Sequence, residues 1–225
     1  MSSSASSPLA HFRLELPGGL VVVPMQAHHA QQCQELQDVV FPTLAPEQRL
    51  RAEHYRYHVT ELFPEGQFVT LDGERVVGAT TAIRMDFDFD HIHHRFEDTL
   101  AGGWLTTHEP GGAWLYGIDV GVHPEYRRRG IARALYAARH ATVKALGLRG
   151  QITAGMMSGY GAVASQMTGE QYYAELLSGQ RTDPTVSAQL RIGFELRGLI
   201  PEYLDDPVCG NYGVLIVLDA AKPVL

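Results

Sequence analysis

Three consecutive arginines, Arg127–Arg129, precede a helix-forming stretch, and this placement indicates an anion-binding site. An apolar run typical of a strand ends at His123-Pro124, a short turn follows, and a helix is expected from Gly130. The N-terminal end of a helix is already positive and presents unpaired N–H groups, so arginines there deepen the positive field. A bound phosphate accounts for this arrangement, and a solvated arginine cluster is the alternative. Gly130 allows the backbone to approach such an anion closely.

The same residues resemble the acyl-CoA pyrophosphate loop of the GNAT acetyltransferase superfamily. That loop is written Arg/Gln-x-x-Gly-x-Gly/Ala, and Arg127, Gly130 and Ala132 match it without a gap. The strand expected before the loop and the amphipathic helix expected after it strengthen the match. Gly193-Phe194, followed by a strand-like segment, resembles a later element of the same superfamily.

A wider part of the chain resembles one group within the superfamily, the GNAT module that is fused to carbon–nitrogen hydrolases in bacteria. The stretches that carry this resemblance are Phe63–Gln67, Tyr116–Pro124, Asp183-Pro184 and Gly193–Tyr203. The likeness extends over residues 20–218, nearly the whole chain, and the printed sequence carries no hydrolase half.

The resemblance implies where acetyl-CoA, the co-substrate, binds. Pantetheine would pair like an extra strand with the backbone of Ile118, Val120 and Val122, and the pyrophosphate would lie on N–H groups between Arg128 and Arg133. The full set of expected acetyl-CoA-binding residues is Ile118, Val120, Val122, Arg127, Arg128, Arg129, Gly130, Ile131, Ala132, Arg133 and Gln189. Catalysis would then owe more to positioning than to a covalent intermediate.

Asp119 is the residue that we expect to act as general base. Alternation with a period of two places Asp119, Gly121 and His123 on one face of the strand, opposite its apolar positions. A carboxylate within such an apolar strand is costly unless it is paired or functional. The alternative is a structural carboxylate held by backbone N–H groups or by an arginine. His123 is the poorer candidate, because a histidine before proline at a strand end is often simply exposed.

The general acid is where the chain departs from the family pattern. Many relatives place a tyrosine four residues before the Gly-Phe pair, close to the departing sulfur, and Gln189 stands there instead. Glutamine donates a hydrogen bond but has no proton to give up. Either another tyrosine substitutes or the thiolate leaves without direct protonation. We expect Tyr203 to substitute, ahead of Tyr160, Tyr172 and Tyr173, and a half-buried structural tyrosine is the alternative for each.

The segment Asp86–Arg95 carries a second candidate site, a metal centre. His91 and His93 with Asp88 or Asp90 contain suitable ligand atoms. However, the alternation of Asp and Phe is also typical of an edge strand with one solvated face. Neither a Cys pattern nor HExxH accompanies the segment. We therefore expect no metal, and expect this segment to form a lid that shapes the acceptor site.

Composition is that of an ordinary globular chain. Of its 225 residues, 45% are hydrophobic and 19% charged, and no apolar run approaches the ~20 residues that span a bilayer. A net charge of −7 argues against a nucleic-acid partner. Cys33 and Cys209 lie far apart without CxxC spacing, so we expect reduced thiols and a cytoplasmic location. A homodimer is left open.

The expected fold is α/β (α+β), a GNAT fold with a twisted, mostly antiparallel mixed sheet flanked by helices. We expect a disordered tail over residues 1–11 and one domain over residues 12–225, with insertions near 86–112 and 155–182. Strands are predicted at residues 20–24, 67–71, 76–85, 113–122, 150–154, 195–200 and 212–218, and helices at 27–40, 46–62, 131–146, 170–177 and 186–191. Asp72-Gly73 predicts a hairpin between the second and third strands.

Together these features predict an acyl-CoA-dependent N-acetyltransferase. It would move an acetyl group directly from acetyl-CoA to a primary amine on a small molecule or a peptide. The alternative is a non-catalytic acyl-CoA-binding module that senses the cofactor or recruits a partner, which the departure at Gln189 favours. A dinucleotide-binding oxidoreductase does not fit, because no GxGxxG follows an early strand.

Overall fold

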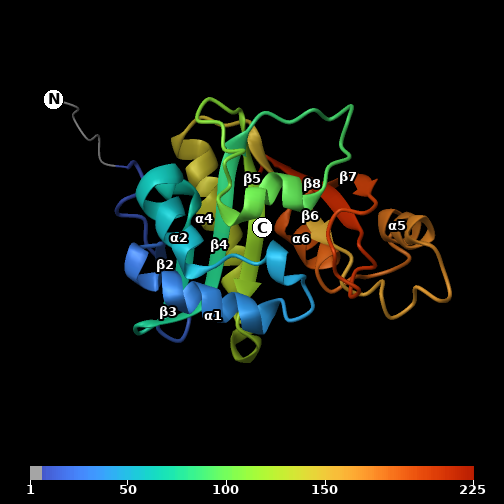
Figure 1. Cartoon of the computed structure of the whole chain (residues 1–225), viewed down its shortest axis with the longest axis horizontal. Coiled ribbons are helices and arrows are strands. Elements are labelled where there is room, and N and C mark those ends of the chain that lie inside the picture. The colour runs from blue at the N-terminus through green and yellow to red at the C-terminus, as the bar shows by residue number, and fades with distance from the viewer. Residues whose placement is uncertain (1–6) are drawn as a thin grey trace.

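A mixed sheet of eight strands runs through residues 7–225, the part of the chain that the computed structural model describes (Figure 1). The strands lie in the order β1-β2-β3-β4-β5-β6-β8-β7. Within these residues β5 and β6 are the one parallel pair. The bounds are β1 Leu14–Glu15, β2 Leu20–Pro24, β3 Phe68–Asp72, β4 Arg75–Met85, β5 Trp114–Val122, β6 Gly150–Met156, β7 Glu195–Ile200 and β8 Gly213–Asp219. The predicted mostly antiparallel mixed sheet is confirmed, as is the hairpin at Asp72-Gly73.

Helices cover both faces of the β2–β5 half of the sheet. α4 packs on one face, where Ile131, Leu135 and Ala138 meet Val22 and Phe68 of the strands. α1 and α2 lie on the opposite face (Figure 1). The α-helices of the described residues are α1 Ala30–Val40, α2 Ala52–Tyr57, α3 Phe96–Leu100, α4 Ile131–Ala145, α5 Gly169–Leu177 and α6 Val186–Ile192.

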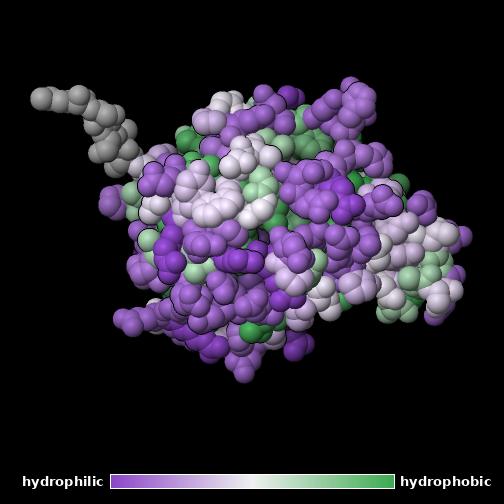
Figure 2. Space-filling model, viewed as in Figure 1, coloured by the Kyte–Doolittle hydropathy of each residue, from purple (hydrophilic) through white to green (hydrophobic). Residues whose placement is uncertain are grey.

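The face that carries α1 and α2 is mostly polar (Figure 2). Apolar and neutral residues gather instead at the protruding end around α5, where Leu177 is 62% exposed. α5 lies in the insertion predicted near residues 155–182, and α3 lies in the one predicted near 86–112. Each of these segments therefore contains a short helix of its own.

Residues 46–62, predicted as one helix, form three short helical pieces. These are a 3₁₀ turn at Pro46–Gln48, then α2, then a π-helical turn at His58–Leu62. The break between the first two follows from a tertiary contact, because the Leu50 N–H donates to the side-chain oxygen of Gln37 on α1. A continuous helix would need that N–H for its own backbone, so the contact interrupts it.

The N-terminal tail predicted for residues 1–11 is described only in part. Residues 1–6 lie outside the described residues. Leu9 is buried and packs in a cluster with Phe12 and with Phe68 of β3. Contact between the N-terminal segment and the sheet therefore begins before residue 12.

A bulge interrupts the pairing of the two long central strands. Thr81 of β4 pairs with Asp119 of β5, but the next residue, Ala82, pairs with Gly117, so the register passes over Ile118. Such a bulge bends its strand and turns side chains to new directions. The bend therefore lies directly beside the carboxylate predicted to be catalytic.

The parallel pairing between β5 and β6 is short. Within the described chain it extends from Leu115 to Gly117, opposite Gln151–Thr153, and we call these paired residues the seam. Beyond the seam β5 stays paired with β4 as far as Val122, and β6 stays paired with β8 as far as Met156. The backbone groups that β5 and β6 turn toward each other past the seam are therefore available to an added strand.

Arg139 of α4 is buried under the bulge, at 1% exposure. Its Nη2 donates to the carbonyl oxygen of Thr81 at 2.7 Å and to the carbonyl oxygen of Asp119. A buried guanidinium is costly unless its N–H groups are bonded, and these two carbonyls supply part of that bonding. Gly117 leaves room for the group, since a methyl carbon there would overlap the guanidinium.

We expect Gly117→Ala to lower the free energy of unfolding by about 1–3 kcal/mol, because the added methyl group overlaps the guanidinium and displaces it from its hydrogen bonds to the Thr81 and Asp119 carbonyls. Gly111→Ala is the control, since a methyl group at Gly111 meets nothing within 4 Å. It should change stability by less than about 0.5 kcal/mol. Denaturant titration followed by circular dichroism measures both variants, and equal stability of the two would contradict the packing described here.

Candidate active site

A cavity of about 580 Å³ lies where β5 and β6 separate, and we call it the central cavity. Its wall is built by the two separating strands, by α4 and α6, by the segment after α1 and by the loop before β8. The lining residues that matter below are Gln37, Gln48, Phe96, Ile118, Asp119, Val120, Val122, Arg127, Ala132, Tyr136, Arg139, Gln189, Tyr203 and Asp206. Segments far apart in the sequence therefore line one cavity.

The N-terminal end of α4 opens beside this cavity. Gly130 precedes the helix in the left-handed conformation, with φ of +82°, and Arg128 has φ of +62°. In the described chain no side chain caps the first turn of α4, so its N–H groups are free to bind a ligand. A methyl group at Gly130 would meet nothing within 4 Å, which shows open space in front of the helix. These features fit a phosphate group.

The residues predicted to bind acetyl-CoA fall into three groups. Ile118, Val120, Val122, Arg127, Ala132 and Gln189 line the central cavity. Arg128, Arg129, Gly130 and Arg133 are exposed around the start of α4. Ile131 is 1% exposed and packs into the core beneath α4, so its backbone rather than its side chain faces the open end.

The three arginines of the loop differ in what they contact. Arg127 lines the central cavity. Arg129 instead lies over the ring of Tyr126, with 4.8 Å between the guanidinium carbon and the ring centroid. Tyr126 is held in turn by a 2.7 Å hydrogen bond from its hydroxyl to Asp72. Arg129 therefore stiffens the loop, whereas Arg127 is placed to meet a ligand.

Asp119 presents its carboxylate to the cavity and is held on both oxygens. Oδ1 accepts the Thr81 N–H at 2.7 Å, and Oδ2 accepts the Gln37 amide at 3.0 Å and the Tyr55 hydroxyl at 3.4 Å. Burial raises the pKa of the Asp119 carboxyl, and the positive charge of Arg139 opposes this rise. Asp119 is thus a partly buried carboxylate that is held by hydrogen bonds and also lines the cavity.

Tyr203 is 3% exposed and also lines the cavity. Its hydroxyl lies 3.1 Å from the hydroxyl of Tyr116, which lies 2.6 Å from Nε2 of His94. Nδ1 of His94 lies 2.8 Å from the carbonyl oxygen of Ile92. The three side chains form one hydrogen-bonded row that leads from the cavity to the insertion at residues 86–112.

The other tyrosines weighed as general acids lie elsewhere. The Tyr160 hydroxyl donates to the carbonyl oxygen of Met167 at 3.3 Å, and the Tyr172 hydroxyl donates to Asp183 at 2.8 Å. Neither they nor Tyr173 are among the described residues that line the central cavity. Of the four tyrosines that the sequence suggested as general acids, Tyr203 is therefore the one that lines the cavity.

Tyr136 of α4 also lines the cavity and was not predicted from the sequence. The side-chain amide of Gln189 on α6 donates to the Tyr136 hydroxyl at 2.9 Å. A signal for Tyr136 was present in the spacing, because Ala132, Tyr136 and Arg139 stand at i, i+4 and i+7 on one helix face. The predicted loop match at Ala132 therefore fixed the face on which Tyr136 also lies.

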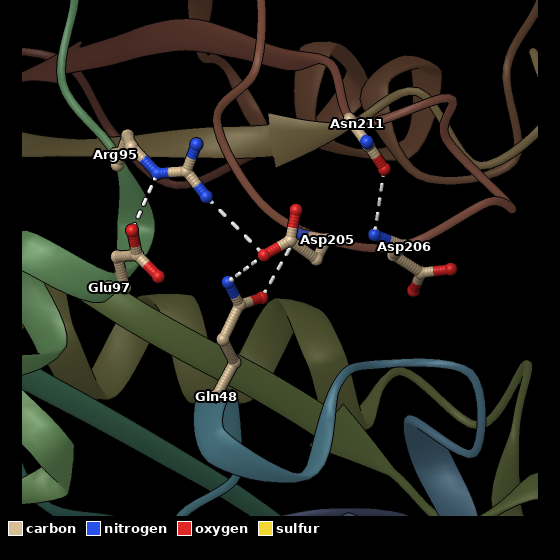
Figure 3. A network of polar contacts seen from close by, with 6 residues as sticks. All are labelled: Gln48, Arg95, Glu97, Asp205, Asp206 and Asn211. Carbon is tan, nitrogen blue, oxygen red and sulfur yellow. Dashed lines mark hydrogen bonds and ion pairs between the residues drawn. The ribbon is translucent and has the colours of Figure 1, made fainter.

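The segment at Gln48 and the loop before β8, which both line the cavity, are joined by hydrogen bonds, and Arg95 adds ion pairs (Figure 3). The Gln48 amide exchanges two hydrogen bonds with Asp205, each 3.1 Å long, one to the carboxylate and one from the backbone N–H. Arg95 pairs with the same carboxylate at 3.3 Å and with Glu97 at 2.7 Å. In Figure 3 the carboxylate of Asp206 points away from this group. The insertion at residues 86–112 is thereby fixed to the loop before β8.

The metal site weighed for the segment Asp86–Arg95 is not assembled. His91 and Asp88 pair at 2.8 Å on the surface. Among residues 7–225 no group of three or more His, Cys, Asp or Glu side chains is arranged to hold a metal ion. The same described residues include no helix long and apolar enough to cross a membrane.

Comparison with known proteins places the chain in a family. Residues 30–155 match the Acetyltransferase (GNAT) family. The uncharacterized N-acetyltransferase YkwB of Bacillus subtilis (strain 168) is 30% identical over 181 residues, which make up 80% of each chain. The probable hydrolase YhcX of the same organism is 36% identical over 183 residues, 81% of this chain, and the chain spans 35% of the length of YhcX.

The fold agrees with that of a solved structure, the GphF GNAT-like decarboxylase in complex with isobutyryl-CoA. The TM-score is 0.71 at 21% identity, and the match covers 88% of this chain and 98% of that chain. Family match, relatives and fold agree with the resemblance noted in the sequence. The protein therefore belongs to the Acetyltransferase (GNAT) family.

Proposed function

We propose that the protein transfers an acetyl group directly from acetyl-CoA to a primary amine of a small molecule or a peptide. The observation that carries this proposal is the central cavity, whose wall contains Asp119 together with Ile118, Val120, Val122, Arg127, Ala132 and Gln189. Direct transfer needs the acetyl donor and the amine to meet beside a group that takes a proton. One cavity with Asp119 in its wall fits that requirement.

The chain fits the donor in two places. The backbone of β5 past the seam is free to pair with the amide groups of pantetheine. The uncapped first turn of α4, with Arg127 beside it, is suited to the pyrophosphate. Acetyl-CoA supplies the activated acetyl group, and these residues bind and orient it.

Asp119 is proposed as the group that takes the proton of the attacking amine. Burial raises its pKa, which makes the carboxylate a stronger base than an exposed one. The Thr81 N–H and the Gln37 amide hold its oxygens in place. The base is therefore both more basic and fixed in direction.

Tyr203 is the candidate that the sequence provides for the hydroxyl that assists the departing thiolate. If it acts in this way, Tyr203→Phe lowers turnover without changing the KM for the acceptor. Thermal melts of the same preparations separate this result from a loss of folded protein.

The remaining parts of the proposal concern location and assembly. Cys33 and Cys209 are both buried free thiols, which agrees with the reducing cytoplasm that we propose as the location. We propose no nucleic-acid or membrane partner, and the amine acceptor is the partner that the site is built to meet.

We expect Gly130→Glu to abolish acetyl-CoA binding, because it places bulk and negative charge where the pyrophosphate lies. Gly147→Glu is a matched control, since Gly147 follows the other end of α4, is also left-handed with φ of +64°, and also faces open space. Calorimetric titration with CoA measures both. Equal affinity in the two variants would place the donor site elsewhere.

We expect Asp119→Asn to cut turnover by roughly 10²-fold while leaving CoA affinity nearly unchanged. Because burial raises the Asp119 pKa above that of an ordinary carboxyl, wild-type turnover should fall as acid protonates the group. The variant should lose that part of the pH profile. Normal turnover of a stably folded Asp119→Asn variant would remove Asp119 from the mechanism.

A panel of amines tests the proposed function itself. Acetyl-CoA-dependent release of thiol that saturates with one amine supports the enzyme. Tight CoA binding with no acceptor-dependent turnover over a broad panel supports the alternative, a non-catalytic acyl-CoA sensor. Loss of acyl-CoA with no acceptor present would point to hydrolysis or decarboxylation instead.

A further inference from the structure

Tyr136 and Tyr203 both line the central cavity, and their hydroxyls differ in the direction of their hydrogen bonds. The carbonyl of Ile92 only accepts, so Nδ1 of His94 carries the proton in the 2.8 Å contact between them. Burial lowers the pKa of His94, so the ring is neutral near pH 7 and its Nε2 accepts from Tyr116. Tyr116 must then accept from Tyr203. The Tyr203 proton is therefore directed away from the cavity.

The hydrogen bonds of the Tyr136 hydroxyl run the opposite way. Its oxygen accepts the amide N–H of Gln189 at 2.9 Å, which leaves its own proton to be donated. Among residues 7–225 the structure provides no acceptor for that proton, although the side chain is 5% exposed. A buried donor without a partner costs free energy unless a ligand satisfies it. Because Tyr136 lines the cavity, an acetyl-CoA atom is the acceptor at hand.

The position of Gln189 in the sequence indicates that the acceptor atom for the Tyr136 hydroxyl is the departing sulfur. Gln189 stands four residues before Gly193, the position at which the resemblance implies a tyrosine close to the departing sulfur. Here the same position on α6 carries an amide that holds a tyrosine of α4. The Gln189 carbonyl oxygen is itself buried and has no hydrogen-bond partner among the described residues. Tyr136 of α4 thus provides a hydroxyl next to Gln189, at the position where the resemblance implies a tyrosine on α6.

We infer that Tyr136 is the catalytic residue that donates a hydrogen bond to the departing sulfur, and that Gln189 positions it. This inference rests on the proposed function, because it assumes that acetyl-CoA occupies the central cavity. Arg139 lies over the Tyr136 ring, with its guanidinium carbon 5.5 Å from the ring centroid. Its positive charge adds to the field that favours a negative sulfur.

The amine nitrogen bonds to the acetyl carbon, its proton passes to Asp119, and the C–S bond breaks with its electron pair on sulfur. A thiol has an ordinary pKa of about 8.5 and a tyrosine one of about 10, and burial raises the Tyr136 pKa further. Tyr136 therefore keeps its proton and stabilises the thiolate by a hydrogen bond. The thiolate takes a proton from water on release, and Asp119 returns its own.

The pKa of the CoA thiol, measured on the bound molecule, tests the inference without any acceptor. The probe is CoA with protein in excess, and thiolate formation is followed by ultraviolet absorbance with desulfo-CoA as the blank. We expect Tyr136→Phe to raise the pKa of the bound thiol by about one unit, a tenfold change. Gln189→Met, which removes the amide, should raise it by a smaller amount. Tyr203→Phe tests the competing tyrosine. Tyr173→Phe is the matched control and should leave the thiol pKa unchanged, because Tyr173 is not among the described residues that line the central cavity.

An unchanged thiol pKa in folded Tyr136→Phe that still binds CoA would overturn the inference and leave the proposed function standing. A rise in Tyr203→Phe alone would assign the sulfur to Tyr203 instead. Failure of the wild type to bind CoA would overturn both. Where an acceptor is known, Tyr136→Phe should also lower kcat by about 10- to 100-fold at constant acceptor KM. A merely structural tyrosine would alter thermal stability and not the thiol pKa.

Discussion

The hydrogen bonds from buried Arg139 to the carbonyl oxygens of Thr81 and Asp119 hold together the part of the sheet on which the site depends. They connect α4 to both β4 and β5 at the bulge that passes over Ile118. A buried cation tolerates little displacement, because each lost hydrogen bond exposes it to an apolar interior. The position of α4 and the bend of the strands are therefore fixed by one group, while Thr81, Gln37 and Tyr55 hold the Asp119 carboxylate.

Around this fixed point the site carries charged and polar groups. Toward the N-terminal end of α4 lie open backbone N–H groups and Arg127, which suit the charged end of a long ligand. Asp119, Asp206 and Arg139 also line the cavity. The cavity wall thus carries charges of both signs, which suits a donor with an anionic tail and an acceptor with a basic group.

The sequence was sufficient for the features that depend on neighbouring residues. The strand before the loop, the start of α4 at Gly130 and the alternation that isolates Asp119 all follow from local pattern. The helix predicted at residues 46–62 was wrong because a distant side chain, Gln37, takes the N–H of Leu50. Tyr136 was overlooked because its partner, Gln189, lies on another helix. Pairing between helices has no periodic signature, so only the fold reveals it.

The shortness of the seam has a thermodynamic consequence. Two half-sheets, β1–β5 and β6–β8, meet through pairs at Leu115–Gly117 alone within the described residues. A ligand that pairs along the free backbone of β5 would act as an additional strand between them. Its binding would then contribute to the cohesion of the folded chain, and occupancy and resistance to unfolding would rise together. A bound substrate would in this way add one strand to the sheet between β5 and β6.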